Sequence, residues 1–202
     1  MMVTAQEIDS RIVAFKNDLS QIKPLHAVRK HIIDGNCAII SDNSYFELRQ
    51  EVSERFDVHT NEVLVVGSSK LGFSIAPRKR YRHFSVTSDI DVVVVSDVLF
   101  DTAWKRVHQY WLDGGYWENA GEFKKYLFRG WIRPDKLPDE VTFDFALEWW
   151  EFFNSLTSSG KYSAYKIAGA LYKNWYFLES YQLKGVCECV NDLVPGGNPN
   201  AN

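Results

Sequence analysis

Two short runs of β-branched residues stand in the middle of this chain. The first occupies residues 63–66 and ends in Gly67-Ser68-Ser69, and the second occupies residues 92–95 and follows Asp89-Ile90-Asp91. Continuous apolar runs of this length are typical of strands that are buried on both faces. If the two strands are antiparallel neighbours, the end of the first and the start of the second lie at one edge of a sheet. The pattern then places a Gly-Ser turn opposite two carboxylates.

Helical periodicity on both sides of these strands indicates an α/β fold of the α+β type, with a small mixed or antiparallel sheet flanked by helices. A capping box at residues 4–7 and apolar positions 8, 12, 15, 19 and 22 predict a first helix that ends at Pro24. A short helix is expected up to about Asp34, with Gly35 as its cap, and another from a capping box at residues 44–47.

Three more helices are expected after the second strand. The stripe Phe100, Trp104, Val107 and Trp111 predicts a helix with a buried aromatic face, ended by glycines 114 and 115. Further helices are predicted around 119–128 and over 163–184. The segment 141–146 alternates and favours a strand that would turn Asp144 away from the core, but a helix from about 139 fits the same residues.

Length and composition predict one globular domain of 202 residues, since 46% of them are hydrophobic and 24% are charged. We expect N-terminal helices over 1–60 packing on a core at 61–157, a C-terminal helical segment at 158–194 and a disordered tail at 195–202. Without an apolar run of membrane-spanning length or a secretory signal, a soluble, cytoplasmic protein with no membrane partner is expected. The three cysteines are expected to be reduced, the net charge of −3 argues against wrapping nucleic acid broadly, and the oligomeric state stays open.

Asp89 and Asp91 are the candidate metal ligands. Strand alternation points both carboxylates to one side, about 6–7 Å apart, while Ile90 faces the core. Mg²⁺ prefers one or two carboxylates together with substrate phosphate oxygens. Gly67 permits a tight turn and a close backbone approach, and Ser68 and Ser69 can donate hydrogen bonds to phosphate oxygens. A solvated turn that merely opens a strand is the alternative.

The connector between the two strands is the most basic part of the chain. It carries Lys70 and Arg82 among six basic residues interleaved with aromatic ones. Beside a phosphate site, such a segment would bind a triphosphate or a nucleic acid acceptor. An ordinary solvated loop is the other interpretation.

The Gly-Ser turn followed by Ser-Asp-Ile-Asp and a valine run resembles the signature of the DNA polymerase β-like nucleotidyltransferase superfamily. The resemblance covers about residues 62–96 and implies a small stand-alone member of bacterial type, although the connector is longer than the family's usual one. It implies that Gly67 and Ser68 hold a nucleoside triphosphate such as ATP, and that Asp89 and Asp91 bind two Mg²⁺ ions, with Mn²⁺ as a substitute. Asp144 would be the third carboxylate, which activates the acceptor hydroxyl, and Glu148 is the reserve.

The resemblance also implies that a helix after the core supplies base stacking and a lysine to the phosphates. Tyr165, Lys166 and Lys173 are the matching candidates for nucleotide binding. Half-buried tyrosines and solvated lysines are the competing interpretation of the same residues.

The expected function is Mg²⁺-dependent transfer of a nucleoside monophosphate to a hydroxyl of an RNA end, a protein side chain or a small molecule. By analogy with small family members, a toxin–antitoxin or phage-defence setting is implied. An inactive regulator or antitoxin that binds a nucleotide or a protein partner is the first alternative, and a two-metal phosphohydrolase is the second. Acids that precede their strand argue against haloacid-dehalogenase-type phosphatases and DxD glycosyltransferases, whose acids follow it.

Overall fold

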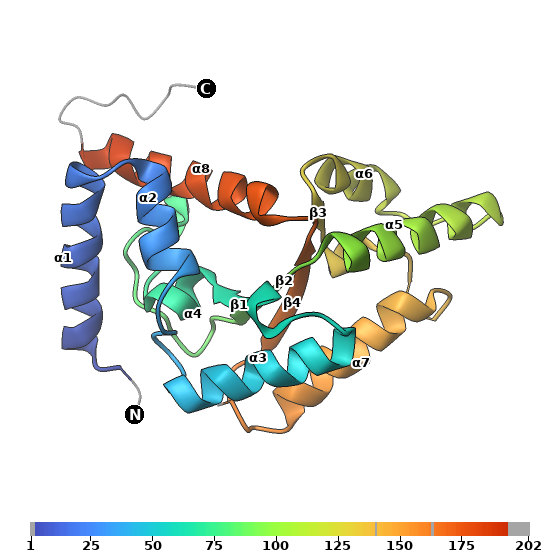
Figure 1. Ribbon diagram of the computed structural model, residues 1–202, viewed down its shortest axis with the longest axis horizontal. Helices are drawn as coiled ribbons and strands as arrows, with labels where there is room; N and C mark the ends of the chain where they lie inside the picture. Colours follow the sequence, from blue (N-terminus) through green and yellow to red (C-terminus); the bar gives the residue numbers. More distant parts are fainter. Residues whose placement is uncertain (1–2, 140, 163, 194–202) are drawn as a thin grey trace.

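A four-stranded mixed sheet lies at the centre of the computed structural model, which describes residues 3–139, 141–162 and 164–193 (Figure 1). The strands are β1 (Val63–Val66), β2 (Ile90–Val95), β3 (Trp131–Ile132) and β4 (Ile167–Tyr172), in the order β1-β2-β4-β3. β1 is antiparallel to β2, β4 is parallel to β2, and β3 is antiparallel to β4. The mixed α/β class predicted from the sequence is therefore confirmed, whereas the tail expected at 195–202 lies outside the described residues.

Alternate residues of a strand face opposite sides of the sheet, and nearly all residues of β1 and β2 are buried. Both faces of the sheet are therefore covered, and helices cover them. On one face pack α3 (Asp42–Phe56), α5 (Asp97–Leu112) and α7 (Asp144–Ser158), against residues such as Val65, Val92 and Leu171. On the other pack α1 (Ala5–Gln21), α2 (Pro24–Val28) and α8 (Trp175–Leu193), against residues such as Leu64 and Val93. In Figure 1, α3 and α7 lie below the sheet and α5 to its right, whereas α1, α2 and α8 lie to its left and upper left.

The short elements join these layers. The π-helical turn η1 (Arg29–Ile33) extends α2, and α4 (Gly67–Leu71) follows β1 directly. The 3-10 turns are η2 (Thr60–Glu62), η3 (Pro77–Lys79) and η4 (Pro134–Lys136), and α6 (Ala120–Phe128) leads to β3.

The predicted capping box opens α1, where the Thr4 hydroxyl accepts from the Glu7 N–H and the Glu7 carboxylate accepts from the Thr4 N–H. The third helix starts earlier than predicted, because Ser41 rather than Ser44 is its N-cap. Ser96 caps α5, and its hydroxyl accepts from the Leu99 N–H at 3.4 Å.

The helix predicted over 163–184 is wrong in its first half, which forms β4 and is followed by α8 from Trp175. Ile167 and Leu171 are four residues apart, which fits one face of a helix, but they also lie on one face of a strand. Parallel pairing with β2 decides between the two, because it completes the hydrogen bonds of a strand that lies between two other strands. Asn174 then accepts from the Phe177 N–H where α8 begins.

The strand favoured for 141–146 is also wrong. Residues 141–142 form a turn in which the Val141 N–H donates to the Asp139 carboxylate, and α7 begins at Asp144. Phe145, Trp149 and Phe153 lie on its buried face, so the aromatic stripe of the helix outweighs the short alternating segment before it.

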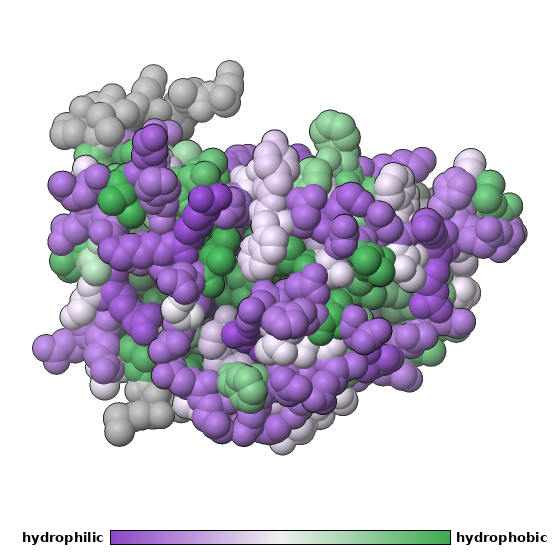
Figure 2. Space-filling model, in the orientation of Figure 1, coloured by the Kyte–Doolittle hydropathy of each residue, from purple (hydrophilic) through white to green (hydrophobic). Residues whose placement is uncertain are grey.

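Half of the aromatic stripe on α5 is solvent-exposed rather than buried. Phe100 and Val107 are in the core, but Trp104 is 45% exposed and Trp111 56% exposed. Within the described residues, no helix is both long enough and apolar enough to cross a membrane. Figure 2 shows hydrophilic residues over most of the visible face, with hydrophobic residues in small separate patches.

Candidate functional site

A cleft of about 1130 Å³ opens at the edge of the sheet where β1 ends and β2 begins. Its walls come from the turn after β1, the basic connector, β4, the segment 131–135 and α8. Asp89 and Asp91 line it together with Gly67 and Ser68. The antiparallel neighbours assumed from the sequence therefore exist, and they bring the Gly-Ser turn and both acids into one cavity.

Gly67 lies beside the side chain of Asp91. Val66 pairs with Asp91 across the two strands, and Gly67 follows with a φ of +66°, a conformation that favours glycine. A Cβ on Gly67 would lie 2.8 Å from the Oδ2 of Asp91. The missing side chain therefore leaves free the space beside this carboxylate, which a ligand needs in order to approach both groups.

Ser69 has a structural position rather than the phosphate contact expected for its side chain. It is fully buried, and its hydroxyl donates to the Val66 carbonyl at 3.1 Å and accepts from the Asp91 N–H at 3.3 Å. It thus ties the turn to the strand that carries the acids. Ser68 is half-buried and faces the cleft.

The pKa of the Asp91 carboxyl group lies well above its ordinary value. Solvent reaches it through the cleft, but the surrounding protein desolvates it, and this burial together with the Asp89 charge raises its pKa to about 6, against a lowering by Lys166. A nearby cation would stabilise the charged form of such a desolvated carboxylate. The free side chains of two acids on one strand face suit a divalent ion that takes its remaining ligands from a substrate.

A third carboxylate is absent from the neighbouring strand. Ala168 pairs with Asp91 in the parallel register, so a small apolar side chain lies beside this acid, and Ala170 pairs with Val93 further along the strand. Over the part of the chain that the structure describes, no group of three or more His, Cys, Asp and Glu side chains is placed to hold a metal. The donor set therefore fits a cation held by two carboxylates and completed by phosphate oxygens, and it does not fit a cage made by the protein alone.

Neither candidate for the third acid reaches the cleft lining. Asp144 is exposed in the first turn of α7, where its charge lies near the positive end of the helix dipole. Glu148 lies on the outer side of the same helix and pairs with Arg55 at 3.5 Å and with Arg106 at 3.9 Å. The strand expected for residues 141–146 would have been needed to bring Asp144 to the acids.

Arg82 and Lys166 line the cleft, as expected of phosphate-binding residues. Three further cations of the lining, Arg78, Lys79 and Lys184, join them. None of these five side chains forms an ion pair with a carboxylate of the described residues, unlike Arg133, which binds Asp135 at 2.9 Å. The cleft therefore offers unpaired positive charge to an anionic ligand.

Lys70, Lys173 and Tyr165 are placed differently from what was expected. Lys70 is buried, with its ammonium donating to the Gly35 carbonyl, and desolvation lowers its pKa to about 8. Lys173 forms an ion pair with Asp101. The ring of Tyr165 packs edge-to-face on Phe84, with centroids 4.8 Å apart.

The cleft also has an aromatic end that sequence reasoning missed. Trp131 stacks on Tyr172 at 5.3 Å, and Tyr181 meets Trp131 edge-on at 4.7 Å. The buried Trp131 indole N–H has no hydrogen-bond partner among the described residues. The aromatic residue between Gly130 and Arg133 was the available signal, but its partners lie some 40 residues further along the chain.

Comparisons with protein-family models, with curated proteins and with solved structures find no match for this chain. The functional argument therefore rests on the cleft itself.

Proposed function

We propose that the protein binds a nucleoside triphosphate with a divalent cation in this cleft and transfers its nucleoside monophosphate to a hydroxyl acceptor. The observation that carries the proposal is the position of Gly67 beside the Asp91 carboxylate, because it brings the Gly-Ser turn and a candidate metal ligand into one cavity. The unpaired Arg82 and Lys166 in the lining supply the charge that a triphosphate needs.

Asp89 and Asp91 would hold the cation, Mg²⁺ or Mn²⁺, and the ion would neutralise charge on the phosphates. Gly67 and Ser68 would place the triphosphate at the turn. In the transfer, the acceptor oxygen bonds to the α phosphorus, the bond from that phosphorus to its bridging oxygen breaks, and pyrophosphate leaves. The other acids of the lining, Asp135 and Glu188, are paired with Arg133 at 2.9 Å and with Arg80 at 3.5 Å, so the acceptor proton would pass to water in the open cleft.

A second candidate function is binding of the nucleotide without transfer, as in a regulator or an antitoxin. The observation that favours it is Ala168, which occupies the position paired with Asp91 on the neighbouring strand. With no third carboxylate there, the acceptor would have to lose its proton unaided.

Labelled nucleoside triphosphates separate these functions when they are incubated with the full chain, Mg²⁺ and mixed RNA and protein acceptors. Transfer predicts label on an acceptor, together with pyrophosphate release. Binding without transfer predicts saturable retention of the nucleotide with neither product, and a phosphohydrolase predicts inorganic phosphate without acceptor labelling.

Asp91→Asn is the test variant and Asp113→Asn is its control, since Asp113 is an exposed acid that caps the end of α5. We expect Asp91→Asn to abolish Mg²⁺-dependent binding and Asp113→Asn to leave it unchanged. Equal nucleotide affinity in both variants, or affinity that EDTA does not alter, would contradict the proposal.

A further inference from the structure

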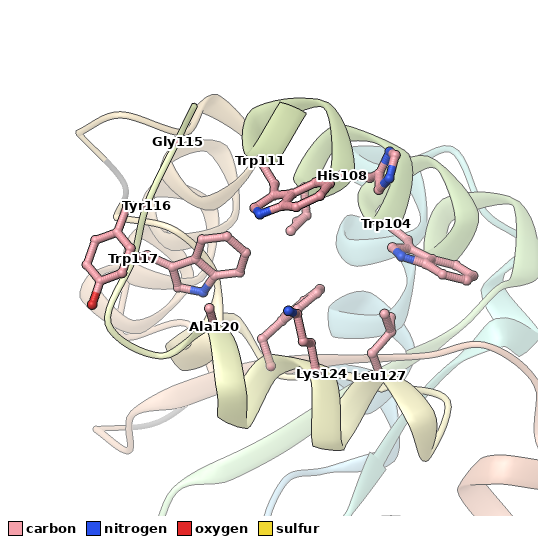
Figure 3. Close-up of a pocket in the computed structure, with 11 residues that line it drawn as sticks. Trp104, His108, Trp111, Gly115, Tyr116, Trp117, Ala120, Lys124 and Leu127 are labelled. Atoms are coloured by element: carbon pink, nitrogen blue, oxygen red, sulfur yellow. The ribbon is translucent and has the colours of Figure 1, made fainter. Parts of the chain in front are cut away.

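A second cavity lies between α5 and α6 and shares no lining residue with the cleft. Its volume is about 350 Å³, which is within the range of small-molecule sites. Trp104, His108 and Trp111 come from α5, Lys124 and Leu127 from α6, and Trp117 from the loop between them (Figure 3). In Figure 3 the rings of Trp104, Trp111 and Trp117 lie around an open space.

The aromatic side chains of this cavity are unusually exposed. Trp111 is 56% exposed, Trp104 45% and Tyr116 84%, all within one short stretch of surface. A cluster of large exposed aromatic residues around a hollow is typical of a binding site rather than of an ordinary surface. Their flat faces match a planar, apolar ring, which can stack or meet them edge-on.

The charged residues of the lining indicate which polar group the ligand carries beside its ring. Its lining contains no Asp or Glu, but it contains Lys124 and His108. The Lys124 ammonium turns into the hollow in Figure 3, and no described carboxylate lies within ion-pair distance of it. The next residue on α6, Lys125, is instead paired with Glu122. Lys124 is solvent-exposed, and an unpaired ammonium beside an apolar hollow favours an anionic group on the ligand.

The hydrogen-bonding groups of the lining are mostly donors. The indole N–H groups of Trp104 and Trp111 form no hydrogen bond with the described residues, whereas the Trp117 indole N–H donates to the Lys136 carbonyl at 3.0 Å. Donors suit a carboxylate, which only accepts hydrogen bonds, whereas a nucleobase also needs acceptors for its own N–H groups. We propose that this cavity binds a small aromatic carboxylate, with its ring between Trp111 and Trp117 and its carboxylate on Lys124.

Equilibrium dialysis of the full chain against 2-naphthoate tests the proposal, with the uncharged 2-naphthamide as the matched ligand. We expect saturable binding of the carboxylate with a dissociation constant below about 1 mM, and at least fivefold weaker binding of the amide. Lys124→Gln should weaken naphthoate binding about fivefold or more and leave amide binding unchanged. Lys125→Gln is the control and should bind like the parent chain.

Ala120→Phe provides a second variant that fills the cavity without touching its charge, and we expect it to abolish binding of both ligands. Its thermal unfolding should match that of the parent chain within a few degrees, which separates filling from misfolding. Equal affinity for carboxylate and amide, no effect of Lys124→Gln, or tighter binding of adenosine monophosphate than of naphthoate would each overturn the assignment.

Discussion

The Asp91 backbone N–H donates to the hydroxyl of Ser69, which is completely buried in the turn after β1. The same hydroxyl donates to the Val66 carbonyl, so one side chain joins the Gly-Ser turn to the strand that carries the acids. The position of the Asp91 carboxylate thus depends on a residue that does not itself reach the cleft.

Ser69→Ala should therefore destabilise the fold and weaken cation binding together. Loss of the hydroxyl leaves the Val66 carbonyl and the Asp91 N–H without this partner in a buried place, at a cost of about 1–3 kcal/mol. Chemical denaturation and Mg²⁺ titration measure the two effects. Thr102→Ala is the control, because that exposed hydroxyl donates only within its own helix, and it should change neither quantity measurably. Unaltered stability of Ser69→Ala would argue against the role given to this hydroxyl.

Gly67→Ala and Gly35→Ala form a matched pair. Both glycines have a positive φ, +66° and +70°, so both alanine variants carry backbone strain of about 1–2 kcal/mol. Only at Gly67 does the new Cβ meet a neighbour, the Asp91 carboxylate, whereas nothing lies within 4 Å at Gly35. We expect similar losses of thermal stability but a loss of nucleotide and Mg²⁺ binding in Gly67→Ala alone. If Gly35→Ala lost binding equally, strain and not crowding would be the cause.

The pH dependence of cation binding should follow Asp91. Because its pKa is raised to about 6, protons compete with the cation, and Mg²⁺ affinity should fall about tenfold for each pH unit below that value. Isothermal titration between pH 5 and pH 8 measures the profile. A profile that is flat across pH 6 would show that Asp91 does not bind the ion.

The stability of the metal-free protein should move in the opposite direction. A carboxyl group whose folded pKa lies above its ordinary value favours the fold while it is protonated, and this contribution is lost as the pH rises from about 4 through about 6. At pH 7.5 in EDTA, Asp91→Asn should therefore melt slightly higher than the parent chain, by about 1–3 °C, since the open cleft screens part of the effect. A lower melting temperature for Asp91→Asn would contradict the desolvation of this group.

Ala168→Asp should supply the carboxylate that the neighbouring strand lacks. Ala168 pairs with Asp91 across β2 and β4 and is only partly buried, so the new side chain would face the cleft about 5 Å away. We expect tighter Mg²⁺ binding and faster label transfer, both measured beside Ala164→Asp as an exposed control before the strand. If transfer is absent in the parent chain and appears in Ala168→Asp, the parent protein is a binder that lost the third acid.

Local sequence determined β1, β2 and the conformation of the turn at Gly67. The valine runs, Gly67 and the alternation of Asp89, Ile90 and Asp91 each specify a conformation within a few residues, because chain sterics and strand geometry act at that range. The capping boxes work at the same range, as Thr4 shows for α1.

Tertiary structure decided what those signals could not. Residues 167–172 fit a helix or a strand, and pairing with β2 selected the strand. Asp144 belongs to α7, because the aromatic residues that follow it are buried on one face of a helix. The third carboxylate expected from the sequence is therefore absent from the cleft. Lys70 is buried and Trp111 is exposed because burial depends on which elements cover a residue, and the order of residues along the chain does not specify that cover.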